Sequence, residues 1–210
     1  MASCPLCHSN INKPFYINDN ATFYKCGVCS LLSKSAQDFP SPTEEKERYL
    51  YHNNNPSDNG YQEFVSPIVK AIERDFSKES KGLDFGAGTG PVVSKLLSEK
   101  GFSVTLYDAF FYPNEAALNT RYDYIFCCEV IEHFHSPNEE FSLFKKLLKP
   151  NGKLYCMTSI YDSSINFENW YYKNDVTHVV FYTETTLNWI QKKFDYSSVE
   201  IKDRLIVFTT

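Results

Sequence analysis

Four cysteines near the N-terminus have the spacing of a metal site. They form two Cys-x-x-Cys pairs, at residues 4–7 and 26–29, with eighteen residues between the pairs. Each such turn presents two thiolates to one side, and two turns complete a tetrahedral sulfur shell around Zn²⁺. Short strand-like runs at 15–17 and 22–25 separate the pairs. The sequence therefore predicts a zinc ribbon with Cys4, Cys7, Cys26 and Cys29 as structural ligands; a redox pair, or His8 replacing one cysteine, is the alternative.

A glycine-rich run is a second candidate site. Residues 83–90 read Leu-Asp-Phe-Gly-Ala-Gly-Thr-Gly, and glycines at alternate positions let the backbone approach a ligand closely. The run has neither the Gly-x-Gly-x-x-Gly spacing nor the Gly-Lys-Ser/Thr ending of nucleotide phosphate loops. Asp84 within it would repel phosphate and favour a cationic ligand. Asp108, about 20 residues further on, is placed to accept hydrogen bonds from both hydroxyls of a ribose.

The pattern Asp-x-Gly-x-Gly-x-Gly followed by Asp108 resembles the class I S-adenosylmethionine-dependent methyltransferases, over about residues 45–210. In that family the glycine loop faces the methionine part and the adenosine of the cofactor. The resemblance implies S-adenosylmethionine as cofactor, with Asp84 beside its charged methionyl end and Asp108 on its ribose. The cofactor-binding residues that it implies are Asp84, Gly86, Ala87, Gly88, Gly90, Asp108 and Glu129.

The chain departs from that family between its second and third strand positions. Asp108 and Asp123 are only 15 residues apart, where the family fits a helix and another strand. We therefore expect the third strand to be short or missing, together with the contacts that it gives the adenine. This compact form resembles the ubiquinone-type methylases.

An acidic segment with a histidine ends another strand-like run. The segment Glu129-Val-Ile-Glu132-His133 precedes an aromatic-rich loop that carries His178. A hydroxyl acceptor needs a base or a metal to lower its pKa, and histidine serves at neutral pH. The candidate catalytic residues are therefore His178, His133 and Glu129. The alternative is that this segment has no catalytic function and only shapes the cofactor pocket.

Two methyltransferase subfamilies suggest different functions for these residues. The Glu-x-x-Glu-His pattern with a later histidine resembles the small-RNA 2′-O-methyltransferases, which implies a second divalent site for Mg²⁺ or Mn²⁺. Its ligands would be Glu129, Glu132, His133 and His178. A histidine in this late loop also resembles the general base of sugar C-methyltransferases with an N-terminal zinc module. In those proteins an acid precedes the histidine, whereas Thr177 stands here.

Alternating strand and helix patterns must position these groups. We expect strands at 82–85, 102–107, 122–128 and 153–158, helices at 91–100, 138–149 and 183–194, and a terminal hairpin of strands 196–202 and 204–208. Such alternation predicts an α/β, Rossmann-like doubly wound sheet with an antiparallel last strand, plus the small N-terminal zinc ribbon.

The predicted organisation has three parts. Residues 1–36 form the zinc ribbon, residues 37–80 a helical linker or lid, and residues 81–210 the methyltransferase domain. Helices are expected at 44–51 and 61–76 in the linker. His52 is a candidate lid residue over the cofactor.

Composition and charge exclude several classes of protein. Hydrophobic residues make up 42% of the chain, enough for a real core. Lys and Arg number 21 against 26 Asp and Glu, and this net charge of −5 argues against broad neutralisation of nucleic acid phosphates. No apolar run approaches the roughly 20 residues of a membrane helix. The first ten residues also lack a charged segment followed by an apolar one. We expect a cytoplasmic protein with no membrane partner.

The function that these residues favour is O-methylation of a small-molecule, sugar or glycan acceptor, with His178 as base or metal ligand. The alternatives are a metal-dependent RNA ribose methyltransferase and a sugar C-methyltransferase, with the zinc ribbon as a recruitment module. A binding module and an inactive scaffold are the rival classes. RNA is less favoured as a partner because the ribbon offers only Lys13, Lys25 and Lys34 as cations.

Overall fold

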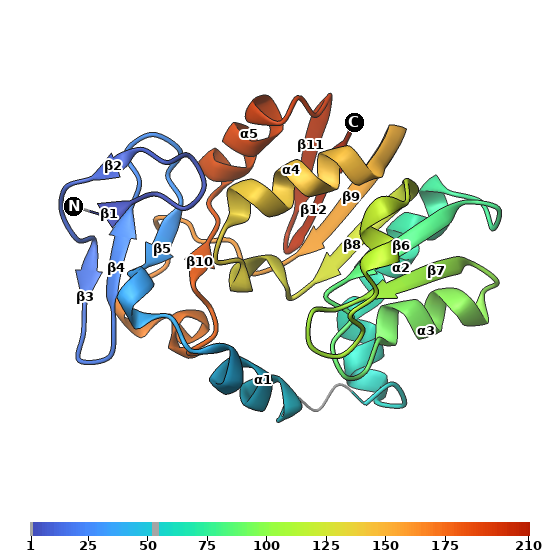
Figure 1. Ribbon diagram of the computed structural model, residues 1–210, viewed down its shortest axis with the longest axis horizontal. Coiled ribbons are helices and arrows are strands. Elements are labelled where there is room, and N and C mark those ends of the chain that lie inside the picture. Colours follow the sequence, from blue (N-terminus) through green and yellow to red (C-terminus); the bar gives the residue numbers. More distant parts are fainter. Residues whose placement is uncertain (1, 52–54) are drawn as a thin grey trace.

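A six-stranded sheet in the order β11-β12-β9-β8-β6-β7 forms the centre of the computed structural model, which describes residues 2–51 and 55–210 (Figure 1). Its strands are β6 (Lys81–Phe85), β7 (Ser103–Tyr107), β8 (Tyr122–Cys128), β9 (Leu148–Met157), β11 (Ser198–Lys202) and β12 (Leu205–Thr209). Strands β6 to β9 pair in parallel, and β12 is antiparallel to β9 and β11. The prediction of a doubly wound α/β sheet with an antiparallel last strand is confirmed. The candidate lid residue His52 lies outside the described residues.

Helices cover both faces of this sheet. They are α2 (Asn59–Asp75) and α3 (Val92–Glu99) on one face, and α4 (Pro137–Leu147) and α5 (Glu184–Lys193) on the other. Because side chains alternate along a strand, Tyr124 and Phe126 of β8 pack with α2 and α3, whereas Ile125 and Cys127 pack with α4 and α5. No helix in the described part of the chain is long and apolar enough to cross a membrane.

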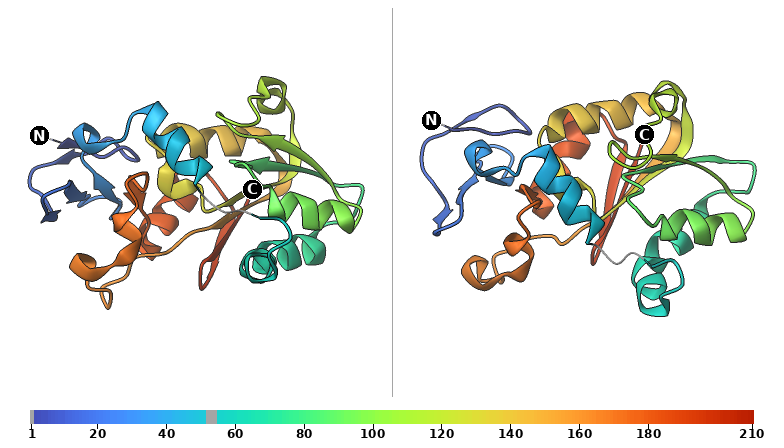
Figure 2. Two further views of the ribbon diagram at one scale, coloured as in Figure 1. Left: turned by 90° about the horizontal axis from the view of Figure 1, so that it is seen from below. Right: turned by 60° about the horizontal axis from the view of Figure 1, so that its bottom comes forward.

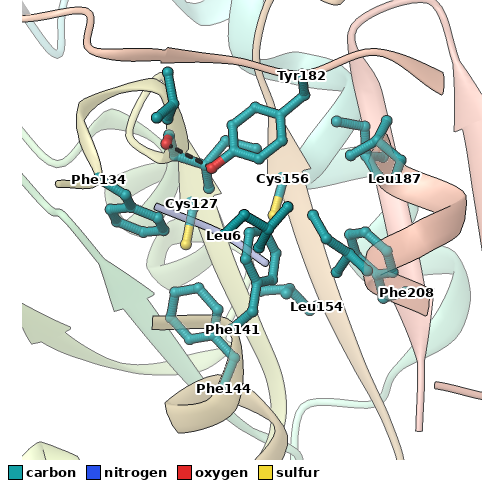
Figure 3. Close-up of a cluster of buried hydrophobic side chains, with 14 of the residues drawn as sticks. Leu6, Cys127, Phe134, Phe141, Phe144, Leu154, Cys156, Tyr182, Leu187 and Phe208 are labelled. Carbon is teal, nitrogen blue, oxygen red and sulfur yellow. Dashed lines mark hydrogen bonds between the residues drawn. The ribbon is translucent and has the colours of Figure 1, made fainter. Parts of the chain in front are cut away.

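The N-terminal segment has its own small sheets but shares one of them with the rest of the chain. The strands are β1 (Ala2–Ser3), β2 (Asn10–Ile11), β3 (Tyr16–Ile17), β4 (Thr22–Lys25), β5 (Leu32–Lys34) and the late strand β10 (Val180–Phe181). In the order β10-β5-β4-β3, Val180 pairs with Ser33. Figure 2 shows the segment after β9 beside this sheet, where Phe167 packs against Phe23 and Trp170 belongs to the same buried cluster. Figure 3 shows Leu6 among the buried side chains of the main core.

Helix α1 (Pro42–Leu50) connects the two parts. Ser41 starts it with a capping box, in which its side chain and that of Glu44 each accept a backbone amide of the other residue. Arg48 forms an ion pair of 2.7 Å with Asp175, and Glu45 forms a hydrogen bond of 3.0 Å with His135. The Arg48 contact joins α1 to the loop that carries His178, and the Glu45 contact joins it to the segment before α4.

The structure corrects one helix and one strand boundary. The helix expected at 138–149 ends at Leu147, and the strand expected from Lys153 begins at Leu148. Pro150 explains the difference, because proline disfavours helical backbone at the residue before it, here Lys149. The strand is irregular at this point, with Asn151 at φ 62° and a register shift between Tyr122 and Tyr124.

The link between β7 and β8 is short, as the 15-residue spacing of Asp108 and Asp123 predicts. Its described residues hold the 3-10 helix η2 (Glu115–Asn119) and no strand, so β7 is the edge of the sheet. The remaining 3-10 helices are η1 (Ala36–Asp38), η3 (Ile131–His133), η4 (Phe167–Asn169) and η5 (Tyr171–Asn174).

Candidate functional site

A cavity of about 520 Å³ lies where β6, β7 and β8 end. This volume suits a cofactor-sized ligand, and the carboxyl ends of strands are where open α/β sheets bind ligands. Its lining includes every residue predicted to bind the cofactor, together with two of the histidines: Asp84, Gly86, Ala87, Gly88, Gly90, Asp108, Glu129, His133 and His178. Glu132 is fully buried behind this wall.

The glycine loop is bent in a way that requires glycine. Gly86 has φ +84° and Gly88 φ +60°, a left-handed region that other residues rarely adopt. A Cβ atom on Gly86 would lie 2.6 Å from both methyl carbons of Val130. The amides of Gly86 and Ala87 donate to the carbonyl of Tyr107, which ties the loop to the end of β7.

The two aspartates of the cavity differ in their surroundings. Asp84 is buried, accepts a hydrogen bond of 2.6 Å from Ser94, and has its pKa raised to about 7 by burial. A cationic group beside it would favour the ionised form. Asp108 accepts three backbone amides, from Gly88 at 2.9 Å and from Phe110 and Phe111 at 2.8 and 3.0 Å. The backbone thus fixes the Asp108 carboxylate at the cavity edge.

Glu129 has a left-handed backbone conformation and forms an ion pair with Arg204. Its φ is 53°, and its Oε2 atom pairs with Arg204 Nη2 at 2.5 Å. Burial and the neighbouring carboxyl of Glu132 raise the pKa of Glu129, while the Arg204 charge opposes the shift. Its other oxygen, Oε1, is buried and has no hydrogen-bond partner among the described residues. Glu129 can therefore accept one further donor from a ligand in the cavity.

The two histidines are held in one tautomer. The Nδ1 atom of His133 lies 2.9 Å from the carbonyl oxygen of Thr177, and that of His178 lies 2.7 Å from the carbonyl oxygen of Tyr172. Because a carbonyl oxygen only accepts, both Nδ1 atoms carry the proton and both Nε2 atoms have a free lone pair. The ring centroids are 4.8 Å apart. Burial, then the nearby His133, lowers the pKa of His178 to about 3, so its imidazole is neutral at physiological pH.

Glu132 completes a group of three possible metal ligands with these histidines. One ligand atom from each of Glu132, His133 and His178 lies within 4.8 Å of the others. Tyr172 donates a short hydrogen bond to Oε1 of Glu132, and Oε2 is buried without a partner in the described chain. Neutral imidazoles oriented by carbonyls, with a free carboxylate oxygen, are the donor set of a divalent metal site. Glu129, predicted as a fourth ligand, lies outside this group and pairs with Arg204.

Several residues of the site lie outside the motifs that the sequence analysis identified. Tyr49 of α1 and Tyr61 of α2 line the cavity, and the Tyr49 ring lies 5.2 Å from that of His133. Both are in the segment expected to form a lid, and their aromatic character is the one signal that the sequence offers for them. Arg204 and Tyr172 reach the acidic pair from distant segments, and no local pattern indicates this.

The four N-terminal cysteines lie together as predicted. The sulfur of Cys4 is 3.5 Å from that of Cys29, and the sulfur of Cys7 is 3.4 Å from that of Cys26. The sulfur atoms of all four cysteines lie within 4.8 Å of one another. Zn–S bonds of about 2.3 Å in a tetrahedron require sulfurs about 3.8 Å apart, so the cluster fits a single zinc ion with a small adjustment.

Comparison with known proteins agrees with this architecture. The sequence profile of the methyltransferase-domain family matches residues 58–201. No curated protein sequence matches the chain significantly. Many solved structures share the fold at low identity, among them the following three. An O-methyltransferase family protein from Burkholderia thailandensis is 11% identical, with a TM-score of 0.57 over 79% of this chain and 61% of that one.

The other two are also methyltransferases. Human N-acetylserotonin methyltransferase in complex with SAM is 12% identical, with a TM-score of 0.55 over 81% of this chain and 56% of that one. Burkholderia thailandensis 1,6-didemethyltoxoflavin-N1-methyltransferase, with bound 1,6-didemethyltoxoflavin and S-adenosylhomocysteine, is 17% identical. Its TM-score is 0.56 over 94% of this chain and 98% of that one. The chain thus spans less than two thirds of the length of the O-methyltransferase family protein and of the N-acetylserotonin methyltransferase. With residues 58–201 matched, it belongs to the methyltransferase-domain family.

Proposed function

We propose that the protein transfers the methyl group of S-adenosylmethionine to a hydroxyl of a small-molecule, sugar or glycan acceptor. The cavity supports the cofactor assignment because its polar groups match both ends of that molecule. Asp84 suits the charged methionyl end, Asp108 the ribose, and Gly86 allows close approach of the backbone. Two structural neighbours were solved with SAM or S-adenosylhomocysteine bound. The cofactor would supply an electrophilic methyl group on a sulfonium.

The observation that carries the choice of acceptor is the pair of free Nε2 lone pairs on His133 and His178. Methyl transfer to oxygen needs an acceptor positioned close to the methyl group and relieved of its proton. His178 lines the cavity with its Nδ1–H fixed on Tyr172, so Nε2 is the atom that can take this proton. Tyr49 closes the same part of the cavity and would exclude water from an acceptor bound there.

Glu132, His133 and His178 also fit a divalent ion, and Mg²⁺ or Mn²⁺ is the candidate. The ion would act as a Lewis acid that lowers the pKa of an acceptor hydroxyl. Because of this group of ligands, RNA ribose methylation is a second candidate function. The net charge of −5 argues against it. Sugar C-methylation uses the same His178 as base.

The test of the function combines binding and turnover. Calorimetry should detect S-adenosylhomocysteine binding to the purified protein. Methyl transfer from labelled S-adenosylmethionine should then be measured on phenols, sugars, glycans and short RNAs, with Mg²⁺, with Mn²⁺ and with EDTA. Transfer confined to RNA would replace the small-molecule proposal, and no binding of S-adenosylhomocysteine would refute the cofactor assignment.

Gly86→Ala should weaken cofactor binding by at least about tenfold, because an added Cβ displaces Val130 toward the cavity and strains a left-handed residue by roughly 1–2 kcal/mol. Calorimetry with S-adenosylhomocysteine measures the affinity. Gly27→Ala is the matched control, since nothing lies within 4 Å of a Cβ there. Adding Val130→Ala should recover part of the affinity by removing the clash. Wild-type affinity in the single variant would contradict the assignment of this loop.

We also propose that the N-terminal cysteines hold a structural zinc ion, since four thiolates leave no open coordination position. A hydrogen bond between the sulfurs of Cys4 and Cys29 lowers the pKa of Cys4 to about 5, which favours its thiolate form. The ribbon would act as a recruitment or stabilising module for the methyltransferase part.

A further inference from the structure

The cavity passes from one face of the sheet to the other. Asp84 lies on the face covered by α3, because Ser94 of α3 donates to its carboxylate. Phe85, the next residue, faces α4, where its ring lies 4.8 Å from that of Phe144. Adjacent strand residues point to opposite faces, so a ligand that fills the cavity has one end at α3 and the other at α4. With the methionyl end at Asp84, the adenine end lies on the α4 side.

The α4 end of the cavity is built from aromatic rings and one carboxyl group. The Tyr107 ring lies 5.0 Å from that of Phe85, and Phe134 packs edge-on to Phe85 at 6.1 Å. Glu140 lines the same cavity one helical turn before Phe144, and thus on the same side of α4. Aromatic rings with a carboxyl group beside them suit a purine ring.

One oxygen of the Glu140 carboxyl group lacks a hydrogen-bond partner in the part of the chain that the structure describes. Its Oε2 atom is buried and makes no hydrogen bond to any described residue. Burial raises the pKa of Glu140 to about 7. A buried carboxyl oxygen without a donor destabilises the fold unless a ligand supplies one.

Tyr107 also brings a polar side chain to that end, but of the two only Glu140 has a buried oxygen without a hydrogen-bond partner among the described residues. The short link after β7 contributes Ala109, Phe110 and Phe111 to the lining, and its described residues form no further strand. On the basis of the proposed function, we propose that Glu140 determines specificity for the adenine of the cofactor, by accepting a hydrogen bond from its exocyclic N6 amine. Helix α4 thereby supplies the polar recognition that a strand after β7 would otherwise give.

The test compares S-adenosylhomocysteine with its 6-deamino analogue, in which a hydrogen atom replaces the N6 amine. By calorimetry, the wild type should bind S-adenosylhomocysteine at least about tenfold more tightly than the analogue. Glu140→Met removes the acceptor at similar volume and should bind both ligands with affinities within about threefold of each other. Glu140→Gln keeps an acceptor oxygen and should retain part of the preference. Glu139→Met, at the exposed neighbouring position of α4, should keep the wild-type ratio.

Thermal unfolding gives a second readout. Because Glu140→Met removes an unpaired buried carboxyl, the ligand-free variant should be at least as stable as the wild type, whereas a purely structural Glu140 would make the variant less stable. A wild-type protein that binds both ligands equally, or a Glu140→Met variant with an unchanged ratio, overturns the inference and leaves the proposed function standing. If the wild type binds neither ligand, both proposals fall. The wild-type ratio needs no variant and stays informative if a substitution impairs folding.

Discussion

His178→Ala is expected to slow methyl transfer by about 10²–10⁴-fold on the acceptor that the wild type uses. The affinity for S-adenosylhomocysteine should stay within about threefold of wild type. The physical reason is that His178 lines the cavity and its Nε2 lone pair stays available, because Nδ1–H is fixed on the carbonyl of Tyr172. Calorimetry and a product assay on the same protein preparation separate the two quantities.

Chelation distinguishes the two functions proposed for His178. If Glu132, His133 and His178 hold a divalent ion, EDTA should abolish methyl transfer by the wild type. Added Mn²⁺ or Mg²⁺ should then restore the activity. If His178 acts as a base alone, EDTA has no effect. The neutral state of His178 suits both functions, because metal ligation and proton abstraction both use the deprotonated imidazole. A wild-type rate in His178→Ala would contradict both functions.

Much of the fold follows from local sequence patterns. The strands around 83, 105 and 125 are short runs rich in apolar and aromatic residues, and each lies in the central sheet. Gly86 and Asp108 stand at strand ends, and the sheet brings strand ends together, so residues far apart in sequence line one cavity.

The rest of the site depends on contacts between distant segments. Arg204 pairs with Glu129 across 75 positions of sequence because the terminal hairpin turns beside β9, and a lone arginine in a turn gives no sign of this. The resemblance to the small-RNA methyltransferases implies that Glu129 is a metal ligand beside the histidines. The fold instead brings Tyr172 between the two glutamates. Tertiary packing decides such pairs, and spacing along the chain does not.

The association of the N-terminal segment with the methyltransferase part is also not predictable from the sequence. Leu6, inside the first Cys-x-x-Cys turn, is fully buried in the main core, and its carbonyl accepts a hydrogen bond from Asn138 of α4. Strand β5 pairs with β10, and the amide of Lys34 donates to the carbonyl of Val179, next to His178. The cysteine cluster therefore supports both the core and the loop that carries the candidate catalytic histidine.

Removal of zinc should consequently destabilise the whole protein as well as the ribbon. Structural zinc contributes about 10–16 kcal/mol of apparent binding energy in isolated zinc-finger peptides, and each kcal/mol lost lowers Tm by roughly 2–4 °C in a domain of this size. Cys29→Ser, at a fully buried ligand position, should lose the ion and lower Tm by about 10 °C or more. Elemental analysis and calorimetric melting measure the two effects.

Val28→Ser is the matched control for this variant, because Val28 lies in the same turn, is 62% exposed and offers no sulfur. It should keep about one zinc ion per chain and a wild-type Tm. If Cys29→Ser lacks zinc but has the same Tm as the control, the ribbon does not contribute to the stability of the rest of the protein. The packing of Leu6 in the core then does not depend on the ion. If it loses zinc, stability and methyl transfer together, the ion stabilises the loop of His178 through β5 and β10.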